Sequence, residues 1–308
     1  MDDKTVWILT GPTATGKTAL SLETARRWNC EIVCMDSMQI YRGMDIGTAK
    51  PTAEERAAAP HHMLDICEPE ESYSVAQWVE DASARIREIQ ARGRRALIVG
   101  GTGFYLRALR RPMAMGVAAG DPAVRGALER EAAEPGGRER LHGRLREVDP
   151  VTAGRLHPND VRRVVRALEV WQLTGKPFSA QPQETGEAPF RTRCAALTMD
   201  RERLYRRIDR RVEQMMKQGL PEEVRGLWER GLTAEHQSMK GIGYKELIPW
   251  LKGETSLAEA TALIQQNSRH YAKRQWTWFR AEPDVRWVDA EAADAQEQIE
   301  RAWMEECV

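Results

Sequence analysis

Eight residues near the N-terminus have the types and spacing of a phosphate-binding loop. Residues 11–18 read Gly-Pro-Thr-Ala-Thr-Gly-Lys-Thr, which matches the pattern G-x-x-x-x-G-K-[ST]. The glycines let backbone N–H groups turn toward a phosphate, and a helix that begins there adds its positive end. The Lys17 ammonium would reach the outer phosphate, and the Thr18 hydroxyl would bind Mg²⁺. The residues predicted to bind a phosphorylated ligand are Gly11, Pro12, Thr13, Ala14, Thr15, Gly16, Lys17 and Thr18.

Two further polar side chains follow apolar runs that predict strands. Asp36 comes directly after the run 31–35, and its carboxylate could bind Mg²⁺, accept a proton, or simply cap a turn. Thr102 lies in a Gly-Gly-Thr-Gly turn after the run 96–99. Its hydroxyl could face the ligand or cap the helix that starts near Phe104. The residues alone leave these alternatives open.

Three basic stretches are candidates for contact with nucleic acid. Arginines at 162, 163 and 166 share one predicted helix, and six arginines lie between 201 and 211. The third stretch, 265–280, contains no acidic residue and mixes five basic side chains with tyrosine, tryptophan and phenylalanine. Such a mixture suits a nucleic-acid backbone and its bases. The basic side chains could equally form a solvated face, with the aromatic rings in the core.

A metal site built from protein side chains is not favoured. His61, His62 and Asp65 are close in sequence, but adjacent histidines of an extended chain point in opposite directions. We therefore expect structural or polar-contact roles for them. The five cysteines include no C-x-x-C pair, which favours reduced thiols in a cytoplasmic protein.

The elements around these residues alternate between strand and helix. Apolar runs at 6–9, 31–35 and 96–99 predict strands, and helical periodicity follows at 19–28 and at 74–92. This alternation indicates a parallel sheet that binds ligands at the carboxyl ends of its strands.

Three predicted strand ends, at Thr10, Asp36 and Gly100, should therefore converge on one crevice. Ser74 and Gln77 are suited to a capping box at the start of the second helix.

The pattern changes between residues 112 and 193, where strand signals disappear and helical stretches dominate. Alternation resumes with an apolar run at 194–199. We expect an α/β fold of the P-loop kinase type, a parallel sheet flanked by helices, formed by residues 1–111 and 194–308. Residues 112–193 would form an all-helical insertion domain.

The charges are balanced overall but not along the chain. The 308 residues include 46 basic and 46 acidic side chains, yet residues 282–308 carry a net charge of −7. An acidic C-terminal tail therefore offsets a basic body. No apolar run is long enough to cross a membrane, and the first residues have no signal-peptide pattern.

Taken together, the motifs resemble the bacterial tRNA dimethylallyltransferase (tRNA isopentenyltransferase) family. The resemblance covers nearly the whole chain, up to about Trp287. It rests on residues 11–18, 36–39, 44–51, 60–65, 100–103, 157–160, 166–170, 241–246 and 272–280. Two departures stand out, because Trp276 replaces a usually aliphatic residue and the last 20 residues match no motif of the family.

The resemblance implies transfer of a dimethylallyl group from dimethylallyl diphosphate to N6 of the adenosine directly 3′ of a tRNA anticodon. It implies Asp36 as general base, Thr102 as its companion in the reaction channel, and Lys17 with Mg²⁺ at the departing diphosphate. The target base would be flipped into a pocket, and the insertion would grip the anticodon stem. The protein would be a monomer with no membrane partner.

The tRNA contacts that the resemblance implies fall into two groups. Those around the target base are Asp36, Ser37, Met38, Gln39 and Thr102. Those in the basic stretches and near the insertion are Arg125, Arg162, Arg163, Val164, Val165, Arg166, Lys240, Gly241, Ile242, Gly243, Tyr244, Lys245, Lys273, Arg274, Gln275, Trp276, Thr277, Trp278, Phe279 and Arg280.

Three other functions share parts of this pattern. A small-molecule kinase would use ATP at the loop 11–18, with the arginines of 201–211 as a lid, but it leaves the acid-free stretch unexplained. A prenyltransferase acting on free adenine nucleotides needs the same donor site without a grip on tRNA. A non-catalytic RNA-binding protein does not account for a phosphate loop beside Asp36.

Overall fold

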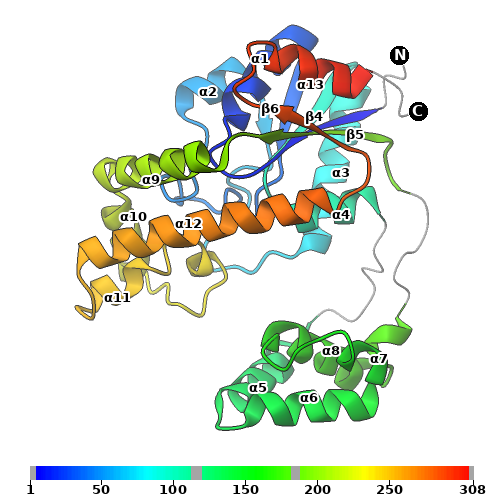
Figure 1. Cartoon of the computed structure of the whole chain (residues 1–308), viewed down its shortest axis with the longest axis vertical. Helices are drawn as coiled ribbons and strands as arrows, with labels where there is room; N and C mark the ends of the chain where they lie inside the picture. Colours follow the sequence, from blue (N-terminus) through cyan, green and yellow to red (C-terminus); the bar gives the residue numbers. More distant parts are fainter. Residues whose placement is uncertain (1–4, 112–119, 182–187, 305–308) are drawn as a thin grey trace. The chain divides into compact units, whose positions relative to one another are not determined.

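A sheet of six parallel strands, in the order β3-β2-β4-β1-β5-β6, organises the larger part of the chain (Figure 1). The structure is a computed structural model that describes residues 5–111, 120–181 and 188–304. The strands are β1 (Val6–Thr10), β2 (Cys30–Cys34), β3 (His61–His62), β4 (Arg95–Val99), β5 (Thr192–Thr198) and β6 (Val285–Asp289). Ile8 of β1 pairs with Ile98 of β4 on one side and Cys194 of β5 on the other. Because both faces of such a sheet are covered, its central strands are mostly apolar.

Helices cover the two faces of this sheet. They are α1 (Lys17–Trp28), α2 (Ala53–Ala58), α3 (Val75–Ala91), α4 (Gly103–Arg110), α9 (Arg201–Gln218), α10 (Leu220–Glu229), α11 (Leu247–Leu251), α12 (Leu257–Arg280) and α13 (Ala295–Met304), with a short 3₁₀ helix at Ser238–Lys240. Helices α1 and α13 pack on one face, and α3 and α4 pack on the other. The long helices α9 and α12 lie against each other (Figure 1).

Two tryptophans, one on each face, anchor these layers through their indole N–H groups. Trp78 of α3 is fully buried and donates to the carbonyl of Cys34 at 3.2 Å. Trp303 of α13 donates to the carbonyl of Ile8 at 3.1 Å and stacks on Trp7 with ring centroids 4.9 Å apart. The helix of the acidic C-terminal tail thus has a structural role, because its apolar side completes the core over β1.

Residues Arg111–Glu187 form a second compact unit, and the first comprises Met1–Arg110 and Ala188–Val308. The described residues of the second unit, 120–181, form α5 (Pro122–Ala133), α6 (Gly137–Val148), α7 (Pro150–Ala153), α8 (Val161–Thr174) and a 3₁₀ helix at Phe178–Ala180. Leucine, valine and alanine side chains of α5, α6, α7 and α8 form its core. No strand occurs between residues 120 and 181. The unit ends six residues earlier than the insertion predicted from sequence, which ran to residue 193.

The predicted α/β fold, a parallel sheet flanked by helices, is confirmed. Helix α3 begins with the predicted capping box of Ser74 and Gln77. Strand β3 was not predicted, because two residues are too short for a periodic signal. Residues 112–119, at the predicted domain junction, and Cys307 with the rest of 305–308 lie outside the described residues. None of the described helices has the length and apolar character needed to span a membrane.

Candidate active site

The carboxyl ends of three strands meet at one edge of the sheet, as the sequence predicted. The hydroxyl of Thr10, which ends β1, donates to the carbonyl of Gly100 after β4 at 2.8 Å. The backbone N–H of Thr102 donates to the carbonyl of Met35 after β2 at 3.3 Å. Its hydroxyl accepts the N–H of Ser37 at 3.1 Å. The three turns therefore form one hydrogen-bonded unit.

The loop 11–18 joins β1 to α1 in a conformation that two glycines permit. Gly11 has φ 132°, and a Cβ there would come within 2.6 Å of the Leu197 carbonyl oxygen. Gly16 has φ 95° and precedes α1 without providing a side-chain cap. The N–H groups of the first helical turn are therefore available to a ligand, together with the positive end of the helix. Ala14 also has a positive φ, 65°, which is strained for a residue with a side chain.

Lys17 lies inside this loop. Its ammonium donates to the carbonyls of Gly11 at 2.9 Å and Pro12 at 2.7 Å, whereas the motif predicted an extension toward a phosphate. Burial and, to a lesser degree, the positive charge of Arg211 lower the pKa of Lys17 to about 7, while Asp36 opposes this shift. A charge-assisted bond to an anion would be a stronger interaction for this ammonium than two neutral carbonyls.

Of the three roles that the sequence left open for Asp36, the structure shows the turn role and leaves one carboxylate oxygen for another partner. Its Oδ1 accepts the N–H groups of Met38 at 2.8 Å and Gln39 at 3.3 Å, which is the turn role. Its Oδ2 accepts no hydrogen bond from the described residues, and Asp36 lines a cavity. Burial raises the pKa of the Asp36 carboxyl, against the opposing effects of the two N–H groups, Lys17 and Arg211. A more basic carboxylate with one free oxygen can accept a proton.

The Thr102 hydroxyl does not cap α4. It faces Ser37, and the N–H groups of Tyr105 and Leu106 reach the Thr102 carbonyl instead. Thr102 thus ties the turn after β4 to the Asp36 segment.

Helix α9 contributes cationic side chains that were not among the predicted site residues. Arg207, Arg210, Arg211 and Gln214 line the same cavity as Lys17. Arg211 donates to the Thr13 hydroxyl at 3.2 Å. The available sequence signal was their spacing of three, one and three residues, which places all four on one helical face. Tyr271 of α12 is a further lining residue that was not predicted.

The cavity at this edge of the sheet has a volume of about 480 Å³. The loop 11–18 and α9 provide its cationic lining. Asp36, which follows β2, also lines the cavity. Ile32, Cys34, Leu64 and Val99 add an apolar part. A site of this size and mixture suits a small anionic ligand with an apolar portion.

Comparison with known proteins places this arrangement in one family. A family model described as "IPP transferase" matches residues 39–282, and one described as "Isopentenyl transferase" matches residues 4–65. A tRNA dimethylallyltransferase of Geobacter metallireducens is 50% identical over 284 residues, which cover 92% of this chain and 91% of that relative. The chain belongs to the IPP transferase family.

Solved structures of the family have the same fold. The tRNA isopentenylpyrophosphate transferase of Bacillus halodurans superimposes with a TM-score of 0.72 at 43% identity, covering 97% of this chain and 94% of its own. A eukaryotic dimethylallyltransferase acting on tRNA gives a TM-score of 0.77 at 30% identity, over 93% of this chain and 74% of its own. The family resemblance inferred from the motifs is confirmed.

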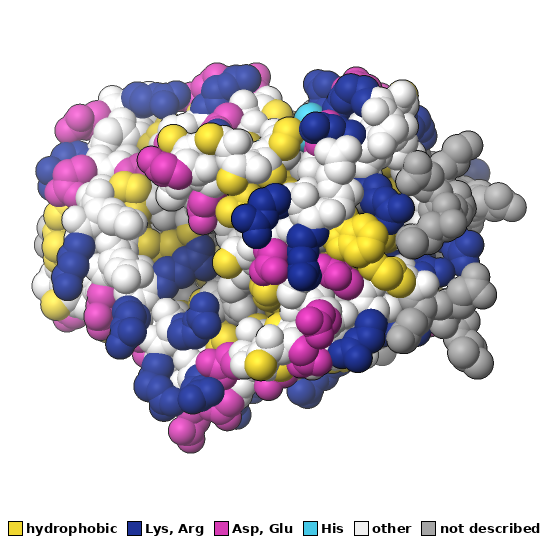
Figure 2. Space-filling view, turned by 90° about the horizontal axis from the view of Figure 1, so that it is seen from above, with side chains coloured by type: hydrophobic (Ala, Val, Ile, Leu, Met, Phe, Trp, Pro, Cys, Tyr) yellow, Lys and Arg dark blue, Asp and Glu magenta, His cyan; other side chains and the backbone are white. Residues whose placement is uncertain are grey.

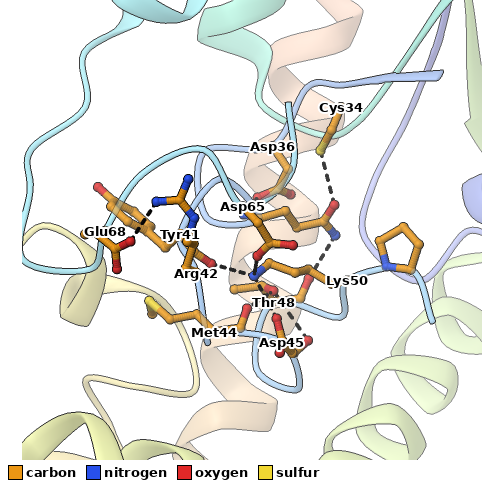
Figure 3. A network of polar contacts seen from close by, with 12 residues as sticks. Cys34, Asp36, Tyr41, Arg42, Met44, Asp45, Thr48, Lys50, Asp65 and Glu68 are labelled. Atoms are coloured by element: carbon orange, nitrogen blue, oxygen red, sulfur yellow. Dashed lines mark hydrogen bonds and ion pairs between the residues drawn. The ribbon is translucent and has the colours of Figure 1, made fainter. Parts of the chain in front are cut away.

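In this family member, the segment that carries Asp36 is folded around one buried lysine (Figure 3). The Lys50 ammonium donates to the carbonyl of Tyr41 at 2.5 Å and to the carboxylates of Asp45 at 2.7 Å and Asp65 at 2.5 Å. Only 1% of the Lys50 side chain is exposed. His61, His62 and Asp65 each have a protein partner, as expected for polar-contact roles.

Replacing Lys50 by Met should lower the free energy of unfolding by about 1–3 kcal/mol, because a buried carbonyl and two carboxylates lose their donor. The cost stays moderate since Asp45 is exposed and Asp65 keeps Arg56. Urea unfolding measures the change. Arg42→Met is the control, because its ion pair with Glu68 is exposed and should contribute under 1 kcal/mol. Equal losses in the two variants would contradict this role of Lys50.

The acid-free part of α12 divides into two faces. Lys273, Arg274, Thr277 and Arg280 are exposed, whereas Phe279 is fully buried. Trp276 and Trp278 are half-buried, and Trp278 lies under the Arg107 guanidinium at 3.9 Å from its ring centroid. The stretch is thus both a basic surface and part of the core. Basic and acidic side chains are interspersed on the face of the molecule shown in Figure 2.

The 240–245 segment has only its two lysines exposed. Lys240 and Lys245 face solvent, whereas Gly241, Gly243 and Tyr244 are buried and Ile242 is half-buried. The Tyr244 hydroxyl donates to Glu223 of α10 at 2.6 Å. The same carboxylate accepts the N–H groups of residues 45, 46 and 47. Tyr244 therefore supports the segment around Lys50, and RNA could meet this part of the chain mainly through the lysines.

The residues of the second unit that were predicted to contact RNA likewise include exposed side chains and side chains with a structural role. Arg162 and Arg163 are exposed, but Val164 and Val165 belong to the core. Arg125 and Arg166 pair with the fully buried Glu169 at 2.9 and 2.7 Å. Both arginines therefore have a structural role inside this unit.

Proposed function

We propose that the protein transfers a dimethylallyl group from dimethylallyl diphosphate to N6 of the adenosine on the 3′ side of the anticodon in tRNA. It would act as a monomer in the cytoplasm. The observation that carries the proposal is that Asp36 and the cationic side chains of Lys17, Arg207 and Arg211 line one cavity. The names of the relatives, tRNA dimethylallyltransferase and dimethylallyltransferase acting on tRNA, support the transferred group and the tRNA substrate.

The cationic wall is suited to the diphosphate of the donor. The N–H groups at the start of α1, Lys17 and Arg211 present donors to an anion in a partly buried site. When the allylic carbon–oxygen bond breaks, negative charge accumulates on the departing diphosphate, and these groups stabilise it.

The residues also fit Mg²⁺. The Thr18 hydroxyl lines the cavity and makes no hydrogen bond to the described residues, and Mg²⁺ commonly binds one such oxygen with phosphate oxygens and water. No group of three or more acidic, histidine or cysteine side chains among the described residues could hold a metal by itself. Thr18 would therefore hold Mg²⁺ jointly with the donor, where the ion would neutralise phosphate charge.

Asp36 would serve as the general base. As the bond from N6 to the allylic carbon forms, the bond from that carbon to the diphosphate oxygen breaks, and the N6 proton passes to Oδ2 of Asp36. The raised pKa of this carboxyl makes it a better proton acceptor. The adenine must leave its stack to reach the cavity, and Ser37, Met38 and Gln39 would surround it.

Two assays test the function. The protein is incubated with Mg²⁺, labelled dimethylallyl diphosphate and either unmodified tRNA or AMP. Label on tRNA is the expected result. Label on AMP but not on tRNA would indicate the prenyltransferase of free nucleotides. In the second assay, which contains Mg²⁺ and ATP, turnover of ATP by a protein that transfers no prenyl group would indicate a kinase.

The exposed stripe of α12 should bind the tRNA backbone. Replacing Lys273 and Arg274 by Ala should weaken tRNA binding and reduce the slope of log affinity against log salt by about 1–2, because phosphate contacts are lost. Fluorescence anisotropy across a salt series measures this slope. The control is Arg26→Ala with Arg85→Ala, which removes the same charge from exposed positions on α1 and α3. An unchanged slope in the α12 variant would make this face structural only.

A further inference from the structure

Gln275 lies on the predicted RNA-binding stretch of α12, but its side chain is only 4% exposed and points to the interior. Its Oε1 accepts the N–H of Thr13 in the loop 11–18 at 2.8 Å. Its Nε2 donates to the carbonyl of Gly101 at 2.9 Å. An N–H can only donate and a carbonyl can only accept, so the two partners determine the orientation of the amide. One side chain thus joins three segments that are distant in sequence.

The two contacts lie at the centre of the site. Thr13 is also held by Arg211 of α9, so the Gln275 contact helps to determine the shape of the loop around Lys17. Gly101 precedes Thr102, whose hydroxyl holds the Asp36 segment through Ser37. The Gln275 amide therefore connects the loop around Lys17 with the turn that holds the Asp36 segment.

The surroundings are built for this contact. A Cβ on Gly101 would lie 2.2 Å from Nε2 of Gln275, so a residue without a side chain is needed there. One turn earlier on α12, Tyr271 also lines the cavity. On the opposite side of the same turns, Lys273 and Arg274 are exposed. The helix thus presents one face to solvent and inserts another into the site.

We infer that Gln275 is a positioning residue rather than a tRNA contact. Its amide fixes the position of the loop 11–18 relative to the Gly101–Thr102 turn. The inference rests on the proposed function for its kinetic readout. Its structural basis, the amide between Thr13 and Gly101, is independent of that function. Gln275 lies on α12 together with the exposed Lys273 and Arg274. The loop 11–18 is therefore held by the same helix that would bind RNA.

The test compares Gln275→Ala with the Lys273→Ala/Arg274→Ala variant. Gln275→Ala leaves the Thr13 N–H and the buried Gly101 carbonyl without a partner, so we expect weaker binding of inorganic diphosphate by calorimetry. We also expect kcat/KM for the donor to fall about 10- to 100-fold, as misplaced reacting groups cause, while the Kd for tRNA stays within about twofold. The α12 surface variant should show the reverse pattern. Weakened tRNA binding with unchanged diphosphate affinity in Gln275→Ala would overturn the inference.

A double-mutant cycle with Gly101→Ala distinguishes loss of the contact between Gln275 and Gly101 from general destabilisation of the protein. Gly101→Ala alone should mimic Gln275→Ala, because its methyl group displaces the amide. In the Gln275→Ala background the added methyl meets no amide, so the double variant should match Gln275→Ala within about twofold in diphosphate affinity. Additive losses would refute the shared contact.

Gln275→Glu provides a third variant, since it keeps an oxygen that can accept the Thr13 N–H but loses the N–H group that donates to the Gly101 carbonyl. We expect this variant to bind diphosphate more weakly than the wild type, and an unchanged affinity would argue against the inference. If the wild-type protein binds diphosphate but transfers no prenyl group to tRNA, the proposed function fails, and the calorimetric comparison still decides the role of Gln275.

Discussion

Replacing Asp36 by Asn should lower the rate of prenyl transfer by about 10²- to 10⁴-fold, the range typical of a lost general base. The amide keeps an oxygen that can accept the N–H groups of Met38 and Gln39, so the turn is retained. Only the proton acceptor is removed. Single-turnover rates with labelled dimethylallyl diphosphate and saturating tRNA measure the effect.

The pH profile sharpens this test. The wild-type rate should fall as the pH drops through the pKa of the Asp36 carboxyl, because protonation removes the base. Burial raises that pKa, so the fall should begin at a higher pH than for a solvent-exposed aspartate. Asp36→Asn should lack this acidic limb, and Asp36→Ala should in addition loosen the turn. Intact single-turnover chemistry with weakened tRNA binding in Asp36→Asn would refute the assignment.

Replacing Lys17 by Met should lower kcat by about 10²- to 10³-fold, comparable to the loss of one donor from an oxyanion site. It should also weaken the binding of dimethylallyl diphosphate, because the ammonium is the one cationic group within the loop 11–18.

Donor binding to the wild-type protein should be accompanied by proton uptake. The pKa of Lys17 is lowered to about 7, so at pH 7 to 8 a large fraction of the free protein carries a neutral amine there. A bound diphosphate favours the ammonium and raises its pKa, so the affinity should decrease as the pH rises above 7. Calorimetry in two buffers of different ionisation enthalpy measures the uptake. Lys17→Met is the control and should show less of it, whereas equal heats in both buffers for the wild type would contradict the prediction.

The sequence predicted the features that depend on local spacing. The loop 11–18, the strands before it and before Asp36, and the capping box of Ser74 follow from residues a few positions apart. A parallel sheet brings its strand ends to one edge, so the convergence of Thr10, Asp36 and Gly100 was predictable from topology.

The amphipathic helices were predicted less completely. Periodicity shows that one face is buried, but it does not say what that face contacts. The side chains of Val164, Val165, Tyr244 and Phe279 were assigned to RNA with their neighbours, and the structure buries them. The arginines of α9 were recognised as a basic stretch, yet only the packing of α9 against α12 brings Arg211 to Thr13.

By itself, then, the sequence determined the family, the phosphate loop and the carboxylate beside it, because each is encoded in short, contiguous motifs. Only the tertiary structure decided which side chains act inside the site and which face solvent. Gln275 and Lys273 are two residues apart in one helix, and the first reaches Thr13 while the second is exposed. That difference depends on contacts between segments more than 250 residues apart in sequence, which no local pattern records.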